Sequence, residues 1–225
     1  MFDRSSKARL TTHDLGRFPD DTLFDRIARA VCRAGCLPRK ELFEAWEVAR
    51  RVRRRFRGGR VVDLCAGHGL LGHIMLILDN SSPAALLVDP SFPSSASTLA
   101  GALVLEWPRL EGRVMRHAAP IEAVALHDDD VVVSVHACGA LTDRVIEASV
   151  AAGARLAVLP CCHDLDAAET SDLTGWMPGA LAVDVTRAMR LRERGWKVWT
   201  QTVPQPITPQ NRLLVAMPVR ARQPI

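Results

Sequence analysis

The chain has 225 residues, of which 48% are apolar and 24% are charged, and its formal net charge is +4. This length and apolar content suffice for one full hydrophobic core, and no run of about 18 apolar residues is present to span a membrane. Charged residues at positions 3, 4 and 7 fall where a signal peptide would need apolar ones, and six cysteines are too few for a disulfide scaffold. We therefore expect a cytoplasmic protein with free thiols.

The first 57 residues predict a tail followed by a helical extension. Residues 1–20 are polar and show no sustained hydrophobic period, so we expect a partly ordered tail. Helical periodicity begins at Asp21, and a second helix is predicted from Arg39 to about Phe56 after Pro38. The glycine pair at positions 58–59 ends this helix, so the predicted division is an extension over 1–57 and a main domain over 58–225.

The second helix carries the strongest charge feature of the chain, the Arg50–Arg60 basic region. Its members are Arg50, Arg51, Arg53, Arg54, Arg55, Arg57 and Arg60. In one interpretation these side chains form a solvated face in which glutamates such as Glu41 and Glu44 interleave. In the other they form a surface that contacts phosphates, because clustered arginines release counterions from a polyanion such as RNA.

The segment from Val61 to Gly72 predicts a strand, a tight loop and a helix. Gly67 and Gly69 permit positive φ and let the backbone lie against a ligand, and the helix that follows offers free N–H groups. The spacing G-x-G-x-x-G also fits the dinucleotide fingerprint, so an NAD-dependent oxidoreductase is one alternative. Asp63 favours S-adenosylmethionine instead, because a carboxylate repels a pyrophosphate but attracts the cofactor's ammonium and sulfonium groups.

Strands and helices then alternate, which indicates a parallel sheet. A second strand over 84–88 ends at Asp89, where a carboxylate can accept both hydrogen bonds of a ribose diol. A third strand over 113–117 precedes Pro120 and Ile121, which can offer apolar cover to an adenine ring. A fourth strand over 131–135 ends in His136.

The C-terminal half continues with a fifth strand over 156–159 and a helix from about Val183 after a polar loop. Two further strands, over 197–203 and 213–218, are joined by a proline-rich turn. A hairpin that closes an otherwise parallel pattern distinguishes a methyltransferase sheet from that of a dinucleotide dehydrogenase.

Several motifs give the chain a specific resemblance. The segments are His136-Ala137-Cys138-Gly139 with Thr142-Asp143, Cys161-Cys162-His163, Asp184-Val185-Thr186-Arg187-Ala188 and Thr208-Pro209-Gln210-Asn211. With the acid-preceded glycine loop they resemble the class I S-adenosylmethionine-dependent methyltransferases, in a branch similar to the tRNA 2′-O-methyltransferases. The resemblance covers residues 39–218 and lacks the zinc-finger segments of those tRNA enzymes. It implies a Rossmann-like α/β fold with a seven-stranded, mostly parallel sheet, a C-terminal antiparallel hairpin and N-terminal helices.

The cofactor implied is S-adenosyl-L-methionine. The cofactor-binding residues expected are Asp63, Cys65, Ala66, Gly67, Gly69, Asp89, Pro120, Ile121 and His136. A binding module that keeps the cofactor site without the chemistry is a further alternative.

The cysteines and histidines at the ends of the fourth and fifth strands should share one pocket, because these ends lie side by side. The cysteines can be small residues that let the cofactor approach, or Cys138 can be a nucleophile of the kind used in RNA pyrimidine C5 methylation. A metal site is chemically allowed. We expect none, because the adjacent Cys161 and Cys162 would point to opposite faces of an extended strand.

Methyl transfer to oxygen needs a base near the acceptor or simple alignment of the acceptor with the sulfonium methyl. His136 and His163 suit proton transfer near neutral pH, and Cys138 completes the expected catalytic set. Asp143 can orient one histidine, although capping a helix is an alternative role. The acceptor expected is RNA bound through the basic region, with a small molecule as the alternative.

Overall fold

The computed structural model describes residues 3–219. Residues 1–2 of the predicted N-terminal tail and residues 220–225 of the predicted main domain lie outside the described residues. Its sheet has seven strands in the order β3-β2-β1-β4-β5-β7-β6. The strands are β1 (Val61–Leu64), β2 (Ala85–Val88), β3 (Val114–His117), β4 (Val131–Ser134), β5 (Arg155–Val158), β6 (Trp196–Thr202) and β7 (Arg212–Pro218). The predicted fold class is confirmed, including the hairpin at the end of the chain.

Strands β1 to β5 pair in parallel, and β7 runs antiparallel to both of its neighbours. β1 pairs in parallel with β2 and β4, with Val61 opposite Ala85 and Val131. β7 lies antiparallel between β5 and β6. The four residues of β1 and of β4 are all buried, as expected for central strands covered on both faces.

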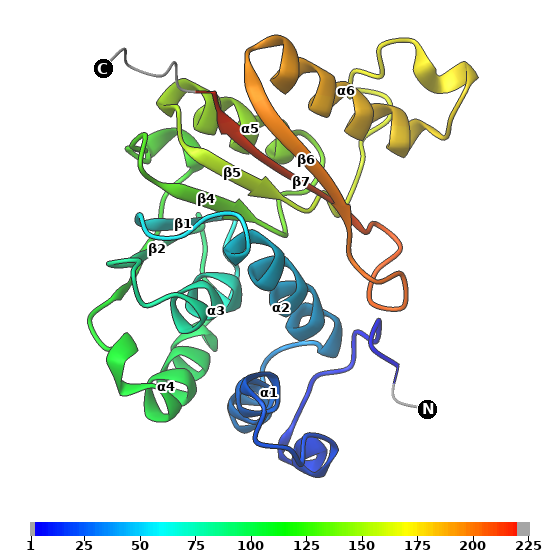
Figure 1. Cartoon of the computed structure of the whole chain (residues 1–225). Helices are drawn as coiled ribbons and strands as arrows, with labels where there is room; N and C mark the ends of the chain where they lie inside the picture. The colour runs from blue at the N-terminus through cyan, green and yellow to red at the C-terminus, as the bar shows by residue number, and fades with distance from the viewer. Residues whose placement is uncertain (1–2, 220–225) are drawn as a thin grey trace.

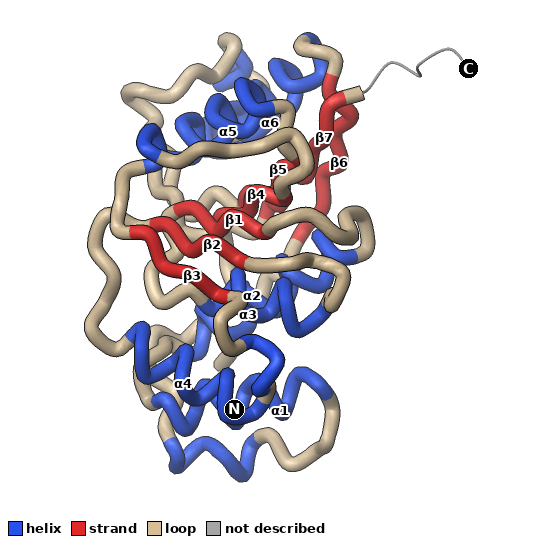
Figure 2. The backbone as a smooth tube through the Cα atoms, turned by 90° about the vertical axis from the view of Figure 1, so that its left-hand side faces the viewer, coloured by secondary structure: helices blue, strands red, loops and turns tan. Residues whose placement is uncertain are grey.

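Helices cover both faces of this sheet (Figures 1 and 2). The helices are α1 (Leu23–Ala34), α2 (Arg39–Arg53), α3 (Leu70–Leu78), α4 (Ala96–Glu106), α5 (Ala140–Ala152) and α6 (Gly179–Glu193). α1 to α4 share one hydrophobic core with a face of the sheet, and α5 packs in a second core on the other face. α6 lies on that second side, against β6 and β7.

The N-terminal segment is more ordered than its polar composition predicts. It contains a short 3-10 helix, η1 (Thr12–Arg17), and the side chains of Leu10 and Phe18 are buried in the core shared by α1 to α4. The backbone N–H of Leu10 donates to the carbonyl of Leu37 at 2.9 Å. Two apolar residues thus fix a segment that has no periodic pattern of its own.

Most helix ends follow local sequence signals. Thr22 caps α1 by accepting a hydrogen bond from the N–H of Asp25 at 3.1 Å. α6 begins at Gly179, four residues before the predicted Val183, because Pro178 lies in an extended conformation at its N-cap and starts the helix there. Among the described residues, no helix combines the length and apolar character needed to cross a bilayer.

Candidate functional site

The glycine loop lies between β1 and α3 and has the conformation that its glycines allow. Gly67 and Gly69 have φ of 52° and 78°, and Cys65 has φ of 58°, which non-glycine residues rarely adopt. A Cβ at Gly69 would lie 2.3 Å from a methyl carbon of Leu87, so this glycine lets the loop pack on β2. A Cβ at Gly67 would meet no atom within 4 Å, so that position leaves room for a ligand.

Two carboxylates flank the loop as the sequence predicts. Asp63 is buried in β1 and accepts a hydrogen bond from the N–H of Gly72 at 2.9 Å. Burial raises its pKa to about 8, and the negative charge of Asp89 adds to the shift. Asp89 follows β2 and accepts from the N–H of Gly67 at 3.0 Å, which places its carboxylate directly beside the open side of the loop.

A small cavity joins these loop residues to α2. Its lining includes Asp63, Ala66, Gly69, Glu41 and His136. Burial raises the pKa of Glu41 to about 7, and the neighbouring Glu44 adds to the effect. One of the two interpretations of α2 placed Glu41 on a solvated helix face. Its position one helical turn before the buried Ala45 is the only sequence signal of its actual location.

His136 follows β4 and is exposed beside this cavity. Desolvation lowers its pKa, with contributions from the positive charges of Lys40 and His68. The imidazole is therefore largely neutral at neutral pH and able to accept a proton. The structure thus places one predicted catalytic residue next to the glycine loop.

The expected adenine side of the site lies after β3. Ile121 is buried in the second hydrophobic core, whereas Pro120 is exposed and precedes a short 3-10 helix over Ile121–Ala123. Glu122 points to solvent and pairs with Arg144 at 3.3 Å. The carboxylate of Glu122 therefore lies at the protein surface, in an ion pair with Arg144.

The three cysteines at the ends of β4 and β5 meet. The Sγ atoms of Cys138 and Cys161 are 2.9 Å apart, and those of Cys138, Cys161 and Cys162 all lie within 4.8 Å of one another. The predicted divergence of Cys161 and Cys162 is wrong, because β5 ends at Val158 and strand alternation no longer applies to residues 161–162. Burial raises the pKa of the Cys161 thiol, and the neighbouring Cys138 raises it further.

His163 belongs to an ion-pair network rather than to the open pocket. Its side chain is 4% exposed, and its Nε2 lies 2.8 Å from Oδ1 of Asp184 in α6. Asp184 also accepts a hydrogen bond from Arg212 at 2.6 Å. Burial opposes ionisation of Asp184, but the hydrogen bonds from His163 and Arg212 outweigh it and lower the pKa of this carboxyl. A catalytic role for His163 stays a prediction.

Asp143 joins the same network through Arg187. Arg187 donates to both carboxylate oxygens of Asp143, at 2.8 and 2.7 Å, and lies 3.3 Å from Asp184. Asp143 therefore pairs with an arginine and does not orient a histidine. The motif residues of the resemblance thus hold α5, α6 and β7 together behind the site.

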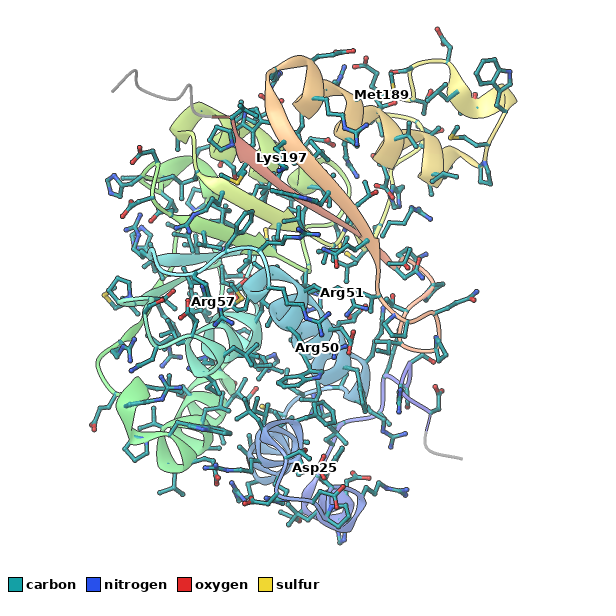
Figure 3. The ribbon with its side chains drawn as sticks, in the orientation of Figure 1. Asp25, Arg50, Arg51, Arg57, Met189 and Lys197 are labelled. Carbon is teal, nitrogen blue, oxygen red and sulfur yellow. The ribbon has the colours of Figure 1, made fainter. Side chains whose placement is uncertain are left out.

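The Arg50–Arg60 basic region is not one continuous solvent-facing surface. Figure 3 shows Arg50 and Arg51 on α2 and Arg57 beyond its end; Arg50 and Arg51 both pair with Glu47. The expectation is wrong for Arg53, which is 2% exposed and lies 3.1 Å from Asp79. Burial lowers the pKa of Arg53 to about 10.

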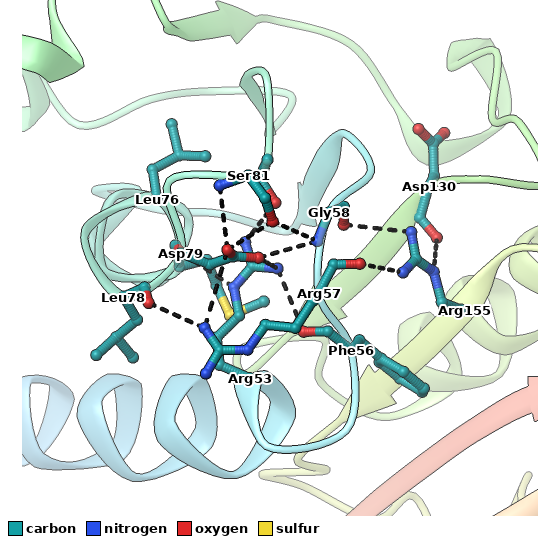
Figure 4. A network of polar contacts seen from close by, with 12 residues as sticks. Arg53, Phe56, Arg57, Gly58, Leu76, Leu78, Asp79, Ser81, Asp130 and Arg155 are labelled. Carbon is teal, nitrogen blue, oxygen red and sulfur yellow. Dashed lines mark hydrogen bonds and ion pairs between the residues drawn. The ribbon is translucent and has the colours of Figure 1, made fainter.

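This region also lies at the edge of the sheet opposite the glycine loop. Figure 4 shows Arg53, Arg57 and Asp79 near Gly58, and Arg155 beside Asp130. Asp130 and Arg155 stand at the amino ends of β4 and β5, and Arg60 donates to Asp130 at 2.9 and 2.7 Å. His136 and the cysteines stand at the carboxyl ends of the same strands. The two groups of residues are therefore separated by the length of the sheet.

A family comparison decides the class of protein. Residues 41–168, more than half of the chain, match a family described as a methyltransferase domain. This chain belongs to that methyltransferase family. The match includes the glycine loop, Asp89, His136 and all three clustered cysteines, and it confirms the class I resemblance at the level of the family.

Solved structures share the fold of this methyltransferase at low sequence identity. An O-methyltransferase family protein from Burkholderia thailandensis is 19% identical with a TM-score of 0.52, over 93% of this chain and 63% of that one. A tRNA methyltransferase from B. subtilis is 12% identical with a TM-score of 0.50, over 76% and 65%. The chain thus spans less than two thirds of either.

A ribosomal protein L11 methylase from Lactobacillus delbrueckii subsp. bulgaricus is similar as well. It is 12% identical with a TM-score of 0.51, over 80% of this chain and 79% of that one. No curated protein matches the sequence. The methyltransferase fold is therefore shown, whereas the similar proteins differ in kind: an O-methyltransferase family protein, a tRNA methyltransferase and a ribosomal protein methylase.

Proposed function

We propose that this methyltransferase transfers the methyl group of S-adenosylmethionine to an acceptor held beside His136, at the carboxyl edge of the sheet. One observation carries the proposal. The loop after β1 exposes Gly67, with open space where a Cβ would stand, and the carboxylate of Asp89 lies 3.0 Å from its backbone N–H. A nucleoside fits this combination, because the ribose diol requires an acceptor and the loop requires close approach.

The residues present fit this cofactor. Asp89 would accept the ribose hydroxyls, Asp63 would face the α-ammonium group from below the loop, and Ile121 would cover the adenine ring. When bound, the cofactor supplies an electrophilic methyl group on sulfur. The buried Asp63, with its pKa raised to about 8, gains a compensating positive charge from such a ligand.

His136 is the proposed base. It lies beside the cavity that Asp63 and Gly69 also line, and its lowered pKa keeps the imidazole neutral at pH 7. A neutral imidazole can accept the proton that an acceptor hydroxyl loses during methyl transfer. His163 would act at a distance, by holding Asp184 and the elements behind the site.

We propose a small-molecule acceptor, because the basic region does not reach the methyl site. The 15 residues of α2 span about 22 Å; Glu41 near its start lines the cavity, and Arg53 at its end pairs with Asp79. The arginines that could neutralise phosphates are thus at the far end of this helix, and several of them already pair with carboxylates.

The decisive experiment is transfer of radiolabelled methyl groups from S-adenosylmethionine into a cell extract, followed by separation of RNA, protein and small molecules. We expect label in the small-molecule fraction and none in a reaction with the Asp89→Ala variant, which should lose cofactor affinity. Label confined to RNA or protein would overturn the acceptor class but leave the methyltransferase activity in place. Absence of label in every fraction would count against the activity itself.

RNA is the second candidate, and one observation favours it. Arg54, Arg55 and Arg57 remain exposed at the end of α2, and one protein of similar fold is a tRNA methyltransferase. If RNA is the acceptor, affinity for bulk tRNA should fall steeply with salt. The double change Arg54→Gln and Arg55→Gln should weaken it, whereas Arg17→Gln, on the distant η1 and 53% exposed, should not.

A further inference from the structure

Three thiol groups converge at the carboxyl edge of the sheet, although they come from two separate loops. Cys138 lies four residues beyond the end of β4, and Cys161 and Cys162 follow β5. The Sγ atoms of Cys138 and Cys161 are 2.9 Å apart, and all three sulfur atoms lie within 4.8 Å of one another.

The backbone produces this convergence. β4 and β5 are parallel neighbours, with Ser134 opposite Val158, so their outgoing loops leave the sheet side by side. The N–H of Gly139 donates to the carbonyl of Cys162 at 3.4 Å and ties the two loops together. Gly139 has φ of 57° and ψ of −127°, a conformation open to glycine and strained for other residues. The cysteine cluster is therefore held by the fold on both sides.

The number and spacing of the sulfur atoms fit a metal better than a disulfide. A disulfide needs two sulfurs about 2 Å apart, which leaves the third cysteine without a role. A zinc ion bound by thiolates has Zn–S bonds of about 2.3 Å, so its sulfur ligands lie about 4 Å from one another. The Cys138–Cys161 sulfur distance of 2.9 Å is shorter than about 4 Å, and the upper limit of 4.8 Å on all three sulfur–sulfur distances is longer. The three sulfur atoms therefore lie near the spacing that a zinc ion requires.

We propose that Cys138, Cys161 and Cys162 form a binding site for a thiophilic divalent cation, with zinc as the ion that fits best. Thiolate sulfur selects such ions over magnesium or calcium, which prefer oxygen ligands. Within residues 3–219, no fourth His, Cys, Asp or Glu joins the three at this spacing.

The site would therefore keep one open coordination position. Cys138 and Cys162 are exposed, so that position faces solvent and can take water or a ligand atom of a substrate. Three protein ligands with an open fourth position are typical of zinc sites that take part in chemistry, whereas structural zinc sites are closed by four. His163 does not complete the set, because neither of its ring nitrogens lies within 4.8 Å of all three sulfur atoms.

The first test uses the full-length, untagged wild-type chain. After removal of bound metal with a chelator under reducing conditions, Co²⁺ is titrated in and the absorption spectrum is recorded. We expect a sulfur-to-cobalt charge-transfer band that saturates at one Co²⁺ per chain and disappears when Zn²⁺ is added. Absence of the band would overturn the proposal, as would peptide mapping that finds a Cys138–Cys161 disulfide in the same reducing buffer.

The second test identifies the ligands. Cys138→Ser, Cys161→Ser and Cys162→Ser should each weaken Zn²⁺ binding by about 100-fold or more, since even changes around a metal ligand cost about 10–100-fold. Cys36→Ser, a free cysteine 8% exposed between α1 and α2, is the matched control and should bind Zn²⁺ like the wild type. Equal affinity in all four variants would overturn the assignment. If a variant fails to fold by circular dichroism, protection of the three wild-type thiols from alkylation by Zn²⁺ decides the same question.

Discussion

Gly67 and Gly69 stand two residues apart in one loop, yet they are glycines for different reasons. A side chain at Gly69 would collide with Leu87 of β2, whereas a side chain at Gly67 would enter open space. Gly69 thus serves the packing of the loop on the core, and in the proposed function the open space at Gly67 admits the cofactor. Substitution by alanine should separate these two roles.

We expect Gly69→Ala to destabilise the protein by about 2–4 kcal/mol, from overpacking against Leu87 and from its positive φ. Gly67→Ala should cost only about 1–2 kcal/mol, the strain of positive φ alone. Its Cβ should instead weaken binding of S-adenosylhomocysteine by about 10-fold or more, equivalent to about 1.4 kcal/mol. Urea denaturation and calorimetric titration measure the two effects; equal stability losses without a change in affinity would contradict this division.

The raised pKa of Asp63 predicts that the affinity for S-adenosylhomocysteine depends on pH. With its pKa raised to about 8 in the free protein, the carboxyl is mostly protonated at pH 7, and a cationic ligand favours the ionised form. Affinity for S-adenosylhomocysteine should therefore rise with pH below about 8, by up to about 10-fold per unit, with release of a proton. Calorimetry in two buffers of different ionisation enthalpy measures that proton. Asp63→Asn should abolish the pH dependence, and a proton uptake would contradict the assignment.

At the scale of elements, α2 serves both ends of the sheet. Its first turns supply Glu41 to the cavity, and its last residue, Arg53, pairs with Asp79 at the end of α3. Arg53 also donates to the carbonyl of Met75 at 3.0 Å. The helix is therefore anchored at the edge opposite the site.

Arg53→Met should destabilise the protein by about 3 kcal/mol, because it removes the buried cation that pairs with Asp79 and the hydrogen bonds from Arg53 to Met75 and Ser82. Arg57→Met is the matched control: Arg57 is 63% exposed and lies 3.8 Å from the same carboxylate, so its loss should cost no more than about 0.5 kcal/mol. Urea denaturation compares the two. A larger loss for Arg57→Met would contradict this account of the network.

The sequence predicts helices, strands and turns well wherever neighbouring residues determine them. The β1 strand, the glycine loop and α3 follow from apolar residues, glycines and their order along the chain. The geometry of Cys161 and Cys162 could not be predicted in this way, because it depends on where β5 ends and on how a neighbouring loop binds to it. The burial of Glu41 and Arg53 could not be predicted from local sequence signals either, because it results from the packing of α2 against α3 and the glycine loop.

At the scale of the whole molecule, Asp184 connects elements distant in sequence. It pairs with His163 after β5, with Arg187 in α6 and with Arg212 in β7. The resemblance to known motifs marked His163, Asp184 and Arg187 but not Arg212, and it could not show that these residues touch one another. Only the order of strands, with β7 between β5 and β6, brings them together.

Asp184→Asn should destabilise the protein by about 3 kcal/mol at pH 7, because it removes the carboxylate that His163, Arg187 and Arg212 share. Since the folded-state pKa of Asp184 is lowered from 3.8, its contribution is present above pH 3.8 and lost as pH falls through the folded-state value. The stability difference between variant and wild type should therefore persist down to about pH 4 and shrink below it. Asp166→Asn, exposed in the loop that carries His163, is the control; a difference that vanishes already at pH 6 would contradict the prediction.

The separation of the two sheet edges has a consequence for protein engineering. The Arg53–Asp79 and Arg60–Asp130 pairs occupy one edge, and the glycine loop, His136 and the cysteines occupy the other. Changes that raise thermal tolerance could therefore be accumulated around Asp79, Asp130 and Arg155 while turnover is left unaltered. Conversely, a library confined to the loops after β4 and β5 that keeps His163, the partner of Asp184, could explore new acceptors while the opposite edge stays unchanged.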